Sequence, residues 1–163
     1  MTMLKTCSIG FDHGPANLRS NAGLTKVYSL ALDDFIIYDS RVAAALAWLV
    51  TRWARETGSH IPDHLKFVCM RAKEIPSKIQ GVGPTKIRTP DSRLFPYFAP
   101  STNPKDHRKH AVWNQRANLV LTAALKHARA KPASAASAKF KTVRDVEAAL
   151  FVMGADLRHA LAT

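Results

Sequence analysis

The spacing of apolar residues constrains this chain more than any other feature. Over residues 42–53, apolar side chains recur at intervals of three and four, which places them on one face of an α-helix. The same spacing returns over residues 113–128 and 143–157. No stretch of the sequence shows the sustained alternation, flanked by hairpin turns, that is typical of paired strands. The sequence therefore predicts an all-α fold.

The residues that flank the first pattern indicate where its helix begins and ends. Asp39 and Ser40 stand where an N-cap belongs, and Gly58 follows the last apolar position. The apolar stripe of this helix should be buried against the helices near residues 113 and 142. The stripe consists of Val42, Leu46, Leu49, Val50 and Trp53.

The sequence also indicates where the last helix begins, and it predicts two shorter helices. Thr142 and Asp145 have the spacing of a capping pair at the start of the last helix. A shorter helix is predicted over residues 24–32. Another is predicted to begin at Pro62-Asp63 and to run to about residue 72, because proline is favoured in the first turn of a helix.

Length and composition favour one globular domain. A chain of 163 residues can bury enough surface to fold without disulfides or metals, and its two cysteines do not make a disulfide scaffold. The longest apolar run has nine residues, against the ~20 that a membrane span needs. We expect a soluble, cytoplasmic protein with a single domain over residues 1–163. Within it we expect an irregular segment over 1–22, a basic Pro-rich loop over 74–106 and a flexible linker over 130–141.

The net charge of +12 is concentrated in the middle of the chain. Residues 61–141 hold sixteen Lys or Arg and four acidic residues, whereas the flanking segments are nearly neutral. A positive field confined in this way is typical of a surface that binds a polyanion, most often nucleic acid. A solvated basic surface and an acidic protein partner are the alternatives.

We identify DNA as the expected partner and assign its phosphate contacts to basic residues of this segment. The loop also carries Phe95, Tyr97 and Phe98, which would either stack on bases or anchor the loop to the core. The candidate DNA-binding residues are Lys78, Lys86, Arg88, Arg93, Lys105, Arg108, Lys109 and Arg116.

Lys26 and Asp39 are the candidates for chemistry. A neutral lysine amine can attack the sugar carbon of a nucleotide, and a fixed carboxylate stabilises the positive charge that develops on the sugar. Such a lysine should lie in a partly buried cleft close to the carboxylate. A cap and a solvated lysine are the structural alternative for the same two residues. Tyr28, Tyr38 and Arg41 are candidates for a pocket that receives the base.

Three stretches of the sequence resemble a known family. The segments 25–28 (TKVY), 35–42 (FIIYDSRV) and 143–154 (VRDVEAALFVMG) are similar to the 8-oxoguanine DNA glycosylase-like family of bacterial proteins, within the helix–hairpin–helix DNA glycosylase superfamily. The resemblance runs from about Gly23 to the C-terminus. It implies a helical glycosylase-like domain, a Schiff base on Lys26 and activation of that lysine by Asp39, with or without associated strand cleavage.

The chain departs from this family in two places. The superfamily hairpin carries two glycines just before the lysine, whereas residues 20–25 (SNAGLT) hold one. The 25 residues before Lys26 are too few for the family's N-terminal helices, so the domain is expected to be shortened there.

Lys86, after the Gly-rich residues 81–85, is a second candidate nucleophile. A basic DNA-binding protein without catalysis is the alternative function, and an RNA-associated protein is a third.

Metal and cofactor sites are not expected. His60 with His64, and His107 with His110, have helical spacings but lack the Glu or Cys partners of zinc sites. The sequence contains neither a Walker phosphate loop nor a dinucleotide fingerprint.

Overall fold

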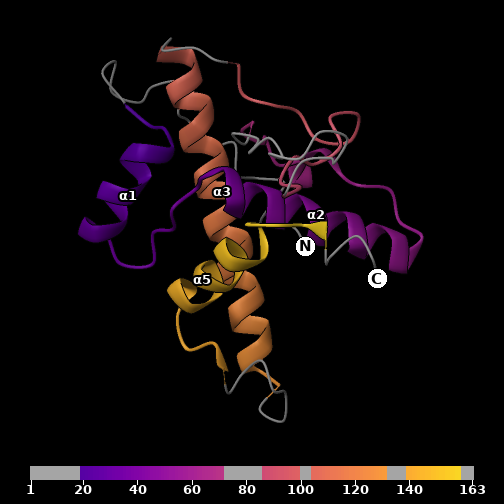
Figure 1. Ribbon diagram of the computed structural model, residues 1–163. Coiled ribbons are helices and arrows are strands. Elements are labelled where there is room, and N and C mark those ends of the chain that lie inside the picture. Colours follow the sequence, from indigo (N-terminus) through magenta and orange to yellow (C-terminus); the bar gives the residue numbers. More distant parts are fainter. Residues whose placement is uncertain (1–18, 72–85, 100–103, 132–138, 159–163) are drawn as a thin grey trace. The chain divides into compact units, whose positions relative to one another are not determined.

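The computed structural model describes residues 19–71, 86–99, 104–131 and 139–158 (Figure 1). These residues contain no named strand, and the prediction of an all-α fold is confirmed. None of the described helices is long and apolar enough to cross a membrane. The elements are α1 (Ala22–Ala31), α2 (Ser40–Thr57), the short 3₁₀ helix η2 (Asp63–Leu65), α3 (Pro104–Arg129) and α5 (Val143–Met153).

The chain divides into two compact units, each built from two separate stretches. Unit 1 comprises Met1–Asp39 and Ala99–Ala149, and unit 2 comprises Ser40–Phe98 and Leu150–Thr163. One boundary falls at the first residue of α2, and another falls within α5. Unit 1 therefore holds α1 and α3, and unit 2 holds α2 and residues 86–98 of the basic loop.

The first helix begins with a side-chain cap. The carboxamide oxygen of Asn21 accepts hydrogen bonds from the backbone N–H groups of Gly23 and Leu24, which have no partner inside the helix. The helix is held to the rest of unit 1 at its buried side, where Arg144 donates to the carbonyl oxygen of Ser29. The predicted helix over residues 24–32 is thus present and begins two residues earlier.

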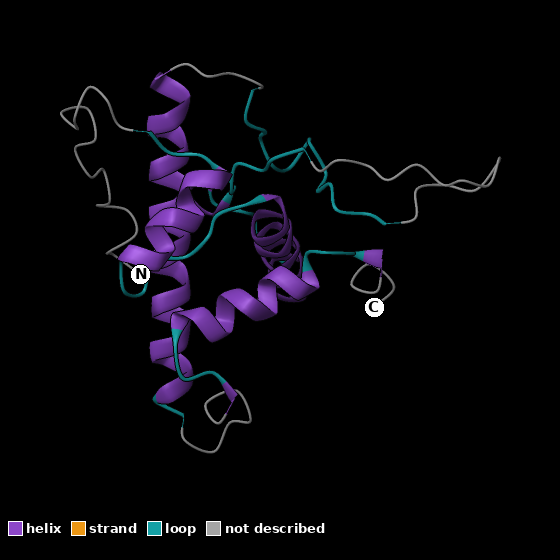
Figure 2. Cartoon of the chain, turned by 60° about the vertical axis from the view of Figure 1, so that its left-hand side comes forward, coloured by secondary structure: helices purple, strands orange, loops and turns teal. Residues whose placement is uncertain are grey.

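The long helix α3 begins earlier than the sequence pattern predicts. Its 26 residues start at Pro104, in the first turn where proline is tolerated, so the basic loop ends before residue 104 instead of at 106 (Figure 2). Residues 74–85 and 100–103 of that loop lie outside the described residues, as do 132–138 of the predicted linker and 1–18 of the N-terminal segment. Of the apolar stripe predicted for α3, Trp113, Ala117, Leu121 and Leu125 are buried, whereas Ala124 is exposed.

The helix α2 agrees with its predicted range, but its buried face is rotated from the predicted stripe. Val42 and Leu46 are buried, whereas Leu49 is 39% exposed and Trp53 is half-buried, so the prediction for Leu49 is wrong. Val50 is buried as predicted, and the side of the helix opposite Leu49 is buried through alanines such as Ala47 that the predicted stripe does not include. The buried side of α2 is lined largely by alanines, and a prediction based on the largest apolar side chains does not find that side.

The predicted helix over residues 62–72 is also wrong. Only one 3₁₀ turn forms, over Asp63–Leu65. The next buried residues are not helical, because Cys69 forms an isolated β-bridge with Tyr97: the N–H of Cys69 donates to the carbonyl of Pro96, and the N–H of Phe98 donates to the carbonyl of Cys69. This pairing uses groups that a helix would have kept within itself.

The last helix begins with the predicted capping pair. The N–H of Asp145 donates to the hydroxyl of Thr142 at 3.1 Å, and the carboxylate of Asp145 accepts from the N–H of Thr142 at 2.8 Å. These bonds lower the pKa of Asp145. The helix ends at Met153 instead of 157, and Gly154 follows it in close contact with the start of α2.

Gly154 gives the sharpest test of this packing. A Cβ atom added there would lie 1.9 Å from the carbonyl oxygen of Arg41, and backbone cannot yield as a side chain does. We expect Gly154→Ala to lower the free energy of unfolding by about 2–3 kcal/mol, measured by urea denaturation. Gly58→Ala is the control: Gly58 has a φ of 63° but open space around it, so only the cost of a left-handed residue, about 1 kcal/mol, is expected. Equal losses in both variants would contradict the close contact.

Candidate catalytic and DNA-binding residues

Asp39 lies directly before the first residue of α2, as predicted, and its side chain is half-buried. A carboxylate at this position is near the exposed N–H groups of a helix start, which favour negative charge. Its position depends on residues 36–38, which lie outside the helices and are largely buried.

Two asparagines of α3 hold the backbone of Ile36. The carboxamide oxygen of Asn118 accepts from the N–H of Ile36 at 2.9 Å, and the carboxamide nitrogen of Asn114 donates to its carbonyl at 3.0 Å. Asn118 also donates to the side-chain oxygen of Asn114 at 2.8 Å, so each asparagine orients the other. The N–H and the carbonyl of Ile36 therefore each have a hydrogen-bond partner, which a neighbouring strand would supply in a sheet.

His110 continues this series one turn earlier. Its Nε2 lies 3.2 Å from the carbonyl oxygen of Tyr38 and must be the donor, because that oxygen can only accept. In the neutral ring, Nδ1 then accepts from the hydroxyl of Ser20, 2.9 Å away. His107 lies one turn further, with its Nδ1 2.8 Å from the carbonyl oxygen of Ser20. We call these four side chains the polar ladder: His107, His110, Asn114 and Asn118.

The structure shows what His107 and His110, which were noted in the sequence only for their helical spacing, are bonded to. His107 and His110 bind the backbone of Ser20 and Tyr38. Within the described ranges, no group of three His, Cys, Asp or Glu side chains is placed to hold a metal ion. The sequence does carry a signal for the polar ladder: its four residues recur at intervals of three and four, on the side of α3 that is apolar further along the helix.

Lys26 lies in the middle of α1 and is exposed. The buried side of that helix carries Thr25 and Ser29, so the lysine points away from the interior of unit 1. The partial burial expected for a nucleophile is therefore not found. The residues beside it on the exposed side are apolar, with Val27 57% and Leu30 88% exposed.

The three candidates for a base pocket have different surroundings. Tyr38 is fully buried, and its ring packs edge-on against His110 with the centroids 5.6 Å apart, so it belongs to the core. Tyr28 is half-buried and donates to the carbonyl of Arg19 at 2.7 Å. The guanidinium of Arg41 lies over the ring of Phe151, 4.3 Å from its centroid.

Four candidate DNA-binding residues form one face of α3. Their spacing of three, four and eleven residues places them within about a third of the helix circumference, opposite the side that carries the polar ladder and Leu121. Over its whole length α3 contains six Lys or Arg and one acidic residue, Asp106. We call this surface the basic face: Lys105, Arg108, Lys109 and Arg116.

The other candidates belong to the loop. Lys78 lies outside the described residues. Lys86 is exposed and Arg88 is half-buried, both in unit 2. Arg93 forms a two-pronged ion pair with Asp91, with a shortest distance of 2.7 Å, so its charge is balanced within the loop. Phe95, at 1% exposed, anchors the loop to the core.

Comparisons with models of protein families, with curated proteins and with solved structures found no match to this chain. What its residues do is therefore inferred from their own chemistry and placement.

His110 should make stability depend on pH. Burial lowers the pKa of His110 from 6.5 to about 4, so between these values the unfolded chain binds a proton that the folded one does not. Stability should be highest above about pH 6.5 and fall by roughly 2–3 kcal/mol as pH drops toward 4. Urea denaturation at several pH values would measure this.

His127→Gln, at an exposed position of α3, should keep that pH dependence, whereas His110→Gln should be less stable and lose most of it. A direct NMR titration of the His110 ring covers the case in which that variant does not fold. A pKa near 6.5 in the folded protein would contradict the buried ladder.

Proposed function

We propose that the chain binds DNA through the basic face of α3 and removes a base from it, with Lys26 as the nucleophile and Asp39 as the supporting carboxylate. The observation that carries this proposal is that both residues and the whole basic face belong to unit 1. One compact unit thus holds a candidate nucleophile, a carboxylate and a surface for phosphates.

The chemistry can be written with these residues. The lone pair of the neutral Lys26 amine bonds to the sugar carbon C1′, the bond from C1′ to the base breaks, and the base leaves with a proton given up by the amine. The bond from C1′ to the ring oxygen O4′ then opens, and the second amine proton passes to O4′. The product is a Schiff base between Lys26 and C1′. Asp39 stabilises the positive charge that develops on the sugar during the first step.

The exposure of Lys26 sets a condition on this mechanism. A lysine amine in water is protonated at neutral pH and cannot attack, so the bound DNA itself must exclude water from it. The exposed apolar residues Val27 and Leu30 next to it would contribute to that exclusion. The same exposure favours the second candidate function, a protein that binds DNA through the basic face without cutting the base away.

Borohydride trapping separates the two functions. Borohydride reduces a Schiff base to a stable amine, so a nucleophilic Lys26 leaves the protein covalently joined to DNA. We expect trapping on duplexes that carry one modified base, such as 8-oxoguanine, uracil or hypoxanthine, and none with Lys26→Gln. Asp39→Asn should slow base release.

Lys126→Gln is the matched control, because it removes an exposed lysine from the other end of α3. It should trap like the unaltered protein. Trapping by Lys26→Gln would move the nucleophile to another amine, Lys86 first. Binding of all duplexes with no trapping on any of them would support the non-catalytic function.

The basic face should determine the salt dependence of DNA binding. Each phosphate contact contributes a slope of about −0.9 to a plot of log binding constant against log salt concentration. The double variant Lys105→Gln/Lys109→Gln should reduce the slope by roughly 2 and weaken all sequences alike. Lys126→Gln/Lys131→Gln, with the same loss of charge, should change it less. A flat plot for the unaltered protein would exclude DNA binding by this face.

A further inference from the structure

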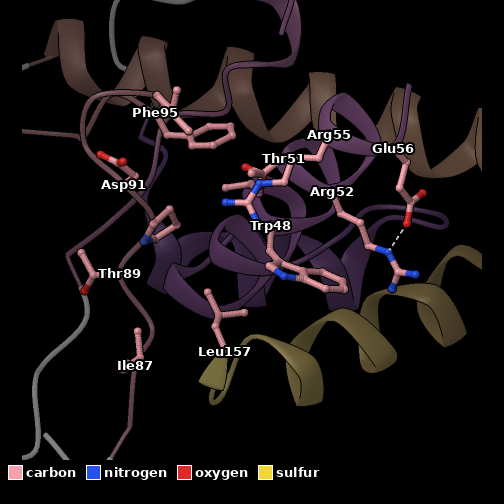
Figure 3. A pocket seen from close by; sticks show the side chains of 13 residues that line it. Trp48, Thr51, Arg52, Arg55, Glu56, Ile87, Thr89, Asp91, Phe95 and Leu157 are labelled. Carbon is pink, nitrogen blue, oxygen red and sulfur yellow. Dashed lines mark hydrogen bonds and ion pairs between the residues drawn. The ribbon is translucent and has the colours of Figure 1, made fainter. Parts of the chain in front are cut away.

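A cavity of about 470 Å³ lies within unit 2, on residues that the proposed DNA chemistry does not use. One wall is α2 from Ala47 to Glu56, the other is the loop from Ile87 to Phe95, and Leu157 closes the lower side (Figure 3). Volumes of this size are typical of sites for small molecules.

Aromatic and aliphatic side chains make up much of the lining. Trp48 is half-buried, while Phe95 and Leu157 are buried beneath the surface of the cavity. Ile87 and Leu94 are 37% and 41% exposed, so both present apolar surface to the cavity. A ligand with an apolar, flat body would cover surface that water otherwise contacts.

Three of the four charged side chains that line the cavity are held in ion pairs. Arg52 pairs with Glu56 at 2.6 Å and lies 5.6 Å from the centroid of the Trp48 ring. Asp91 accepts from Arg93 through both carboxylate oxygens, which holds the pKa of Asp91 at about 2. Both pairs leave no net charge at their positions.

Arg55 is the group that is not balanced. No acidic side chain among the described residues pairs with its guanidinium. Figure 3 shows Arg52 turned toward Glu56, while Arg55 extends the other way over the cavity. A guanidinium beside an apolar wall is suited to a carboxylate or phosphate group, which it binds with two parallel hydrogen bonds.

The loop wall is fixed from several directions, so the cavity exists before any ligand binds. The N–H of Leu157 donates to the carbonyl of Ile87 at 2.7 Å, and the N–H of Ile87 donates to the carboxylate of Asp156 at 3.3 Å. The N–H of Phe95 closes a turn onto the carbonyl of Asp91 at 3.0 Å. A preformed wall lowers the entropy cost of binding.

We propose that this cavity binds a small molecule made of a flat aromatic ring and one anionic group, with the ring against Trp48 and the anion on Arg55. A nucleoside monophosphate and an aromatic carboxylate share this chemistry. The inference is independent of the proposed action on DNA, because no cavity residue is among the candidate catalytic residues.

Isothermal titration calorimetry on the full chain tests the proposal with three probes. Deoxyguanosine monophosphate and indole-3-acetate each carry a ring and an anion, and deoxyguanosine has the ring alone. We expect at least one of the two anions to bind, and to bind at least tenfold more tightly than deoxyguanosine. Which of them binds identifies the source of the anionic group.

Arg55→Gln should weaken the binding of that anion at least tenfold, while Lys126→Gln, with the same loss of charge outside the cavity, should leave it unchanged. Lys26→Gln should also leave it unchanged, which keeps this result separate from the trapping experiment. The proposal is overturned if neither anion binds at millimolar concentration, if deoxyguanosine binds equally well, or if Arg55→Gln binds like the control.

Discussion

The hydrogen bonds from the polar ladder to residues 36–38 are the interaction on which unit 1 depends. Ile36 and Tyr38 are fully buried in a segment outside the helices, and no named strand of the described structure pairs with them. A buried backbone group without a partner costs about 1–3 kcal/mol, so such a segment needs partners from elsewhere. Asn114, Asn118 and His110 supply them. The end of this segment is Asp39, whose position before α2 follows from these bonds.

This arrangement explains which parts of the fold were predictable. Local rules were sufficient for the range of α2 and for the cap formed by Thr142 and Asp145, because those features depend on residues close together in the chain. The predicted helix over 62–72 failed because the partners of Cys69 lie near residue 97, which local spacing does not reveal. Leu49 was misplaced for a similar reason: alanines, with little apolar volume, mark the buried side of α2.

The candidate site was predictable to a different degree. The position of Asp39 before α2 follows from the sequence, since it is a property of one helix, whereas the basic residues were identified as a cluster and their common face on α3 was not, because the helix begins at Pro104 and not near residue 113. The surroundings of Lys26 do not follow from the sequence either, because its exposure is set by the side of α1 that packs in unit 1. Tyr38 shows the same limit: its sequence neighbours suggest a base pocket, and its contact with His110 makes it a core residue. The cavity of unit 2 had no sequence signal, since its walls are about forty residues apart.

The two proposed binding sites differ in how their positive charge is arranged, and this difference separates what they would bind. In unit 2, acidic residues two to four positions away in the chain balance Arg52, Lys66, Arg93 and Arg158. In α3 of unit 1, six basic residues share the helix with one acidic residue. A field that attracts a polyanion requires many cations on one surface, whereas recognition of a small anion requires one unbalanced cation beside an apolar wall. The basic face meets the first requirement, and Arg55 meets the second.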